Sequence, residues 1–149
     1  PSLLKPLVRV DRVVIMYGLN DAALIDAGPR ERTEPRIPLA EYEGNLRALV
    51  EEVRRQGAEP LLCTPNPMTR AHPHASRGLY ARNRDINFAL RDYVAACRRV
   101  AREEKVPLVD VFELIQKRKN WEQLLPDGIH PNAEGLALIA TAVRERISR

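Results

Sequence analysis

The stretch Pro126-Asp127-Gly128-Ile129-His130-Pro131-Asn132-Ala133-Glu134-Gly135, near the end of the chain, organises the rest of the sequence. It joins an acid to a histidine through a glycine turn, just before a helix that Asn132 can cap. A carboxylate that accepts a hydrogen bond from one imidazole nitrogen fixes the tautomer and leaves the other nitrogen free to take a proton from a nucleophile. The stretch therefore predicts that His130 is a general base oriented by Asp127. The simpler alternative is a capped turn with an ordinary loop histidine.

A second motif follows an apolar run much earlier in the chain. Val13-Val14-Ile15-Met16-Tyr17 is typical of a buried strand, and Gly18-Leu19-Asn20-Asp21 comes directly after it. With a strand before the first motif and a helix after the second, the pair resembles the SGNH hydrolases, the GDSL-type esterases and lipases. The matching residues are Gly18, Asn20 and Asp21 in the third block of the family and Asp127, Gly128, His130 and Pro131 in the fifth.

The resemblance implies a serine ester hydrolase that cleaves carboxylic esters of small molecules through an acyl-enzyme. Asn20 would offer its side-chain amide to the oxyanion of the tetrahedral intermediate, with Gly18 and Asp21 shaping that site. His130 would be the general base, Asp127 would orient it, and no metal or other cofactor would be needed.

The nucleophile block of that family is missing from this sequence. In the family the serine lies in a Gly-Asp-Ser block on the first strand, and a glycine from a second block completes the oxyanion hole. The serines of this chain are Ser2, Ser76 and Ser148, and none stands in such a block. We therefore expect the nucleophile to lie outside these residues, and the chain to be the carboxyl-terminal portion of the hydrolase domain.

Alternating apolar patterns along the chain predict strands and helices in turn. Short apolar runs predict strands over 13–17, 61–64 and 108–112. Apolar stripes at helical spacing predict helices over 39–57 and 79–104. A last helix after the His130 motif would bury Leu136, Ile139, Ala140, Val143 and Ile147.

This order of elements predicts an α/β fold in one domain over residues 1–149. Strands that alternate with helices form a parallel sheet covered on both faces, here a three-layer αβα sandwich of the flavodoxin-like type. Three strands would leave an apolar, unpaired edge on the first of them. The resemblance implies a five-stranded sheet, whose two further strands would pair at that edge.

Composition narrows the class of protein. The chain has 149 residues, of which 44% are hydrophobic and 30% charged, as in ordinary globular domains. The net charge is +4 and aromatic residues make up 5%, which argues against a nucleic-acid-binding surface with interleaved aromatics. No apolar run approaches the roughly 20 residues of a membrane span.

Two pairs of residues raise the possibility of metal or disulfide chemistry. His72 and His74 could share a metal with a third ligand such as His130, but Pro73 between them favours an extended loop that shapes the substrate pocket. Cys63 and Cys97 fall on a predicted strand and on the apolar face of a predicted helix, so we expect buried free thiols.

A second functional hypothesis needs no nucleophile. The chain could be a non-catalytic α/β module that keeps the fold and binds a carbohydrate, an acyl group or a protein partner. Labelling by a fluorophosphonate, which requires an activated serine, separates the two hypotheses.

Overall fold

The computed structural model of the protein describes residues 10–24 and 33–148, in which one parallel sheet forms the centre. Its strands are β1 (Arg12–Met16), β2 (Glu59–Cys63) and β3 (Leu108–Val109), in the order β1-β2-β3. Val14 pairs with Leu61, and Leu62 pairs with Leu108. The chain therefore forms successive strand–helix–strand crossovers, as the alternating pattern predicts.

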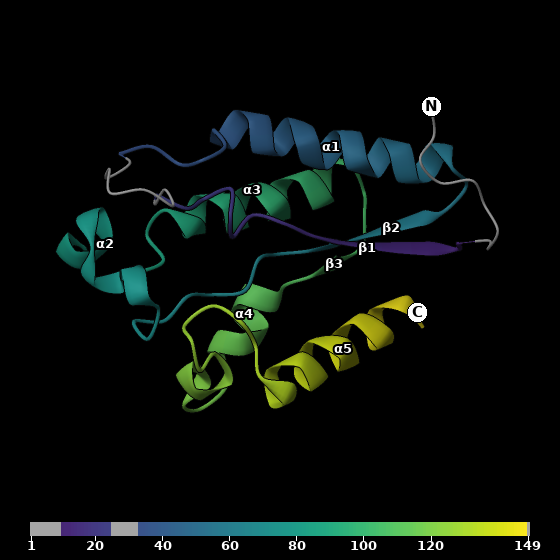
Figure 1. The fold of residues 1–149 in the computed structure, drawn as a ribbon. Coiled ribbons are helices and arrows are strands. Elements are labelled where there is room, and N and C mark those ends of the chain that lie inside the picture. Colours follow the sequence, from purple (N-terminus) through teal and green to yellow (C-terminus); the bar gives the residue numbers. More distant parts are fainter. Residues whose placement is uncertain (1–9, 25–32, 149) are drawn as a thin grey trace.

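Helices cover both faces of the sheet, which gives the predicted three-layer αβα arrangement. Helices α1 (Leu39–Arg55) and α3 (Leu90–Glu103) lie together on one face, and α5 (Ala133–Ile147) runs along the other (Figure 1). The shorter elements lie toward one end of the sandwich. They are two short α-helices, α2 (Gly78–Arg82) and α4 (Val111–Gln116), and two 3₁₀ turns, η1 (Pro73–Ser76) and η2 (Trp121–Leu124).

The two faces of the sheet differ in how completely they are buried. On the α1 and α3 side, the Tyr42 and Tyr93 rings pack with centroids 5.0 Å apart, and both residues are almost fully buried. On the α5 side, Val14 of the edge strand is 45% exposed and Leu136 is 56% exposed. The prediction that Leu136 and Ala140 belong to the buried face of the last helix is therefore wrong. Only part of that helix lies over the three strands, where Ile139, Val143 and Ile147 are partly buried.

The predicted single helix over 79–104 is also wrong, because the chain breaks between α2 and α3. The break carries polar side chains that bind backbone groups: Asn83 accepts from the backbone N–H of Asp85 at 3.0 Å, and Asp85 accepts from that of Asn87 at 2.9 Å. Such local hydrogen bonds compete with the helical ladder. An apolar stripe does not reveal this competition, because Ile86 is buried in either arrangement.

The third strand is shorter than the predicted 108–112. Only Leu108 and Val109 are in the sheet, and Val111 and Phe112 begin α4 instead. Asp110 causes the switch, because its carboxylate caps the new helix by accepting from the backbone N–H of Glu113 at 3.2 Å. Arg98 of α3 donates to the same carboxylate at 2.7 Å. The polar group at this strand end therefore has a structural role.

Candidate active site

The two sequence motifs contact adjacent residues of one loop. Strands of a parallel sheet end at the same edge, so the segments after β1 and β2 emerge side by side. Gly18 packs so tightly that an added Cβ would lie 3.1 Å from Cγ of Pro65, in the loop that follows β2. The next residue, Asn66, donates a hydrogen bond of 2.8 Å to the carbonyl of Ile129. The loop after β2 thus touches both motifs.

The Asp127–His130 turn has the predicted pairing of side chains. Oδ2 of Asp127 lies 2.6 Å from Nδ1 of His130. Oδ1 of Asp127 accepts from the backbone N–H groups of Ile129 at 3.0 Å and His130 at 2.7 Å. An ionised carboxylate only accepts, so an imidazole in its neutral form must donate from Nδ1 in this pair, which leaves Nε2 as the acceptor. No hydrogen bond to Nε2 is found within the described residues, and the His130 side chain is 75% exposed.

The hydrogen bonds to Asp127 also keep it charged. They hold the pKa of the Asp127 carboxyl well below its usual range. The largest contribution comes from the backbone N–H of His130, and smaller ones come from the His130 ring and the backbone N–H of Ile129. An ionised Asp127 favours the imidazole tautomer that a general base requires.

Gly128 allows the Asp127–His130 turn to pack against the backbone of His72. Its φ of +93° lies in the region that favours glycine, and an added Cβ would lie 2.2 Å from the backbone nitrogen of His72. The carbonyl of Gly128 accepts from the backbone N–H of Thr69 at 2.8 Å. Asn132 then caps α5, as predicted, by accepting from the backbone N–H of Gly135 at 2.9 Å.

The Gly18–Asp21 turn is held by its own backbone, by the Asp21 carboxylate and by the backbone N–H of Ile37, which donates to the Asp21 carbonyl at 3.1 Å. The Asp21 carboxylate accepts from the backbone N–H of Gly18 at 3.2 Å, and the carbonyl of Gly18 accepts from Ala22 at 2.9 Å. Gly18 has a backbone φ of +124°, a value that residues with a side chain rarely adopt. Asn20 is exposed, and its side-chain amide has no hydrogen-bond partner among the residues that the structure describes.

His72 lies against the Asp127–His130 turn, with His74 beside it. The rings of His72 and His74 lie 5.1 Å apart, and burial lowers the pKa of His72. Within residues 10–24 and 33–148, no group of three or more histidine, cysteine or acidic side chains could hold a metal. Cys63 and Cys97 are buried free thiols, as predicted, and burial raises their pKa values to about 11 and about 12.

Neither described serine is hydrogen-bonded to the His130 imidazole. Ser76 donates to the carbonyl of Pro73 at 3.4 Å, and Ser148 donates to that of Arg144 at 2.9 Å. Ser2 lies outside the described residues.

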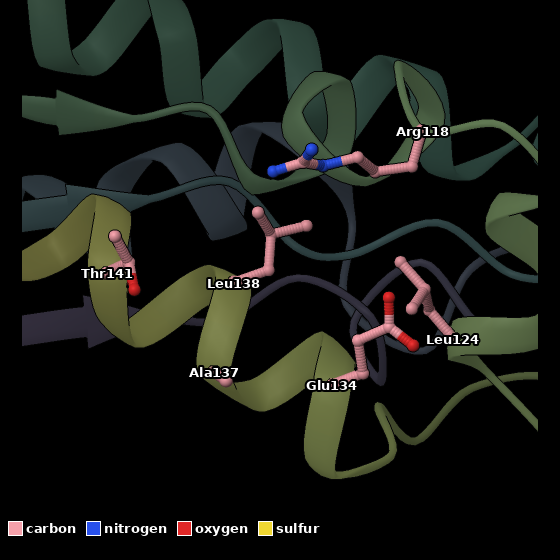
Figure 2. Close-up of a pocket in the computed structure, with 6 residues that line it drawn as sticks. All are labelled: Arg118, Leu124, Glu134, Ala137, Leu138 and Thr141. Atoms are coloured by element: carbon pink, nitrogen blue, oxygen red, sulfur yellow. The ribbon is translucent and has the colours of Figure 1, made fainter.

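A pocket of about 340 Å³ lies beside the first turns of α5 (Figure 2). Leu138 projects from α5 toward the Arg118 side chain, and Glu134 lies across from Leu124. The residues that line it are Arg118, Leu124, Glu134, Ala137, Leu138 and Thr141. Of the six, only Glu134 belongs to the stretch around His130, and it lies past the Asp127–His130 turn in the first turn of α5. The candidate site is therefore the exposed rim around His130 rather than this pocket.

Comparison with known proteins identifies the family. A sequence model of the GDSL-like Lipase/Acylhydrolase family matches residues 1–138 of the chain. The chain belongs to this family. Curated relatives include an isoamyl acetate-hydrolyzing esterase 1 homolog of Rattus norvegicus, 32% identical over 79% of this chain and 48% of its own length. An isoamyl acetate-hydrolyzing esterase of Saccharomyces cerevisiae is 30% identical over 91% of this chain and 56% of its own length.

A solved acylhydrolase structure has the same fold. A lipase/acylhydrolase from Enterococcus faecalis superposes with a TM-score of 0.70 at 22% identity, over 92% of this chain and 60% of the other. The parallel α/β sheet is therefore that of the SGNH acylhydrolases, as the motifs predict. The chain spans about half the length of the curated relatives it matches.

The part of the chain that the structure describes contains no helix that is both long and apolar enough to cross a bilayer.

Proposed function

We propose that this chain supplies the general base and an oxyanion donor of a serine ester hydrolase that acts on carboxylic esters of small molecules. The observation that carries the proposal is the 2.6 Å contact between His130 Nδ1 and Asp127 Oδ2 in a chain of the acylhydrolase family. The names of its relatives, which include isoamyl acetate-hydrolyzing esterases, support the same reaction class.

In this mechanism the nucleophilic serine comes from outside these residues. Nε2 of His130 takes the serine proton while the serine oxygen bonds to the ester carbonyl carbon, and the carbonyl becomes an oxyanion. The amide N–H of Asn20 and nearby backbone N–H groups stabilise that oxyanion, and Gly18 and Asp21 hold Asn20 in place. The intermediate collapses and the imidazolium protonates the departing alcohol. Water, deprotonated by the same imidazole, then releases the acid and frees the serine.

The exposed state of the site supports an external nucleophile. His130 is 75% exposed, Asn20 is exposed, and Val14 on the edge of β1 is 45% exposed. A further strand on that edge would bury Val14 and could carry a serine to the rim where both motifs end.

Hydrolysis of p-nitrophenyl acetate by the protein expressed from its full coding sequence tests the proposal. We expect turnover that EDTA does not change, because the mechanism uses no metal. Turnover that EDTA abolishes would indicate a metal-dependent hydrolase that uses His72, His74 and His130. No turnover on any short-chain ester would favour the non-catalytic module.

A further inference from the structure

The segment after β2 contains an unusual concentration of buried polar side chains. Residues 61–69 are all buried, although the chain leaves the strand after Cys63. Among the described residues, the buried threonines and asparagines are Thr64, Asn66, Thr69 and Asn87. The first three belong to this segment, and Asn87 binds it. A buried polar group costs free energy unless it is hydrogen-bonded, so each of these side chains must have a specific partner.

The partner of Asn66 is the turn that carries the general base. Asn66 is 5% exposed, and its Nδ2 donates to the carbonyl of Ile129 at 2.8 Å and to that of Pro67 at 3.0 Å. Ile129 directly precedes His130. The amide therefore holds the backbone at the residue from which the imidazole projects.

The backbone on either side of Asn66 is restricted. Pro65 and Pro67 flank it in the sequence, and each proline fixes its own φ and limits the residue before it. Asn87 then fixes Met68 from both sides: Oδ1 accepts from the Met68 N–H at 2.7 Å, and Nδ2 donates to its carbonyl at 3.0 Å. The break between α2 and α3 places Asn87 there. A rigid support of this kind is what holds a catalytic side chain to within a fraction of an ångström.

We propose that Asn66 is a positioning residue, whose side-chain amide fixes the Ile129 carbonyl and thereby sets the place and orientation of the His130 imidazole. This inference rests on the proposed function, since it concerns the base of that reaction. Asn66 does not touch the reacting atoms and acts through the turn.

The test uses Asn66→Ala in the protein expressed from its full coding sequence, with two readouts. By ¹H–¹⁵N NMR of the imidazoles, we expect wild-type His130 to be the Nδ1–H tautomer with a downfield Nδ1 proton. In Asn66→Ala that proton should be lost or broadened and the ring nitrogen shifts should move. In steady-state kinetics, kcat should fall roughly tenfold to a hundredfold with KM nearly unchanged, because misplacing a catalytic group costs rate rather than binding.

Thr69→Val is the matched control. It removes a buried hydroxyl from the same segment, where Oγ1 accepts from the backbone N–H of Ala71 at 3.2 Å, but it keeps the backbone bond from Thr69 to Gly128. We expect Thr69→Val to leave the His130 signals and kcat unchanged. Unchanged His130 signals in folded Asn66→Ala would overturn the proposal, as would an equal effect of both variants.

Two measurements keep the test decisive. If Asn66→Ala does not fold, hydrogen exchange of the Asn66 side-chain amide in the wild type replaces it: slow exchange supports the bond to Ile129, and exchange as fast as that of an exposed asparagine overturns it. The imidazole spectra do not depend on turnover. A protein without esterase activity whose His130 signals still respond to Asn66 would therefore reject the proposed function and keep the positioning role.

Discussion

The two halves of the candidate site differ in how they are held. The Asp127–His130 turn is fixed from several sides: Asp127 accepts two backbone N–H groups and pairs with His130, and the loop after β2 binds Gly128 and Ile129. The Gly18–Asp21 turn is closed mainly by its own backbone and by the Asp21 carboxylate, with one outside hydrogen bond from the Ile37 N–H to the Asp21 carbonyl at 3.1 Å. The Asn20 amide has no partner among the described residues. The base is preorganised by the fold, while the proposed oxyanion donor is available for a ligand.

His130→Ala removes the proposed base from the Asp127–His130 turn, the organised half of the site, so we expect this variant to have the largest effect on kcat. Loss of the base should lower kcat by about a millionfold in the complete enzyme, as for other catalytic histidines of this type. The exposed side chain contributes little packing, so the circular dichroism spectrum should not change. A kcat within tenfold of the wild type would mean that the turn is only a helix cap.

Asn20→Ala tests the Gly18–Asp21 turn, the open half of the site, whose amide has no partner among the described residues. Loss of one oxyanion donor typically lowers kcat by roughly a hundredfold to a thousandfold, and KM should hardly change because the amide acts in the transition state. Since the side chain is exposed and unbonded among the described residues, the free energy of unfolding should change by less than about 0.5 kcal/mol. An unchanged kcat would remove Asn20 from the site.

Gly128→Ala measures how tightly the organised half is packed. A Cβ would lie 2.2 Å from the His72 backbone at a φ of +93°, so the free energy of unfolding should fall by about 2 kcal/mol or more. Gly44→Ala is the control, because a Cβ there meets nothing within 4 Å and α1 should gain up to about 1 kcal/mol of helix propensity. Equal urea midpoints for the two variants would contradict the close packing of the turn.

The smallest effect concerns pH. The pKa of Asp127 lies below the ordinary aspartate value of about 3.9, so the unfolded state binds the proton first as pH falls. The contribution of the ionised turn to stability is therefore complete above that pH and declines as the solution is acidified below it. Carboxyl ¹³C titration should give Asp127 a lower midpoint than aspartates that accept no such hydrogen bonds. A midpoint near 3.9 would mean that the Asp127–His130 contact is weak in solution.

The sequence predicted the Asp127–His130 turn better than it predicted the residues that hold the turn in place. Short-range signals, the acid three residues before a histidine and the capping Asn132, are enough to build the turn, and the structure forms both contacts. It also predicted the parallel crossovers around β2. It gave no role to Asn66 or Asn87, because their partners are backbone groups of distant segments that leave no periodic signal. For the same reason Asp110 ended the third strand early and polar side chains broke the helix over 79–104.

Mass-spectrometric mapping of a fluorophosphonate label on the protein expressed from its full coding sequence tests the central claim most directly. We predict one labelled serine outside residues 1–149, in a Gly-Asp-Ser block upstream of Asn20, and loss of labelling in His130→Ala. Labelling that persists without His130, a label on Ser76 or Ser148, or no labelling of the wild type would contradict the assignment of His130 as the base of a serine hydrolase.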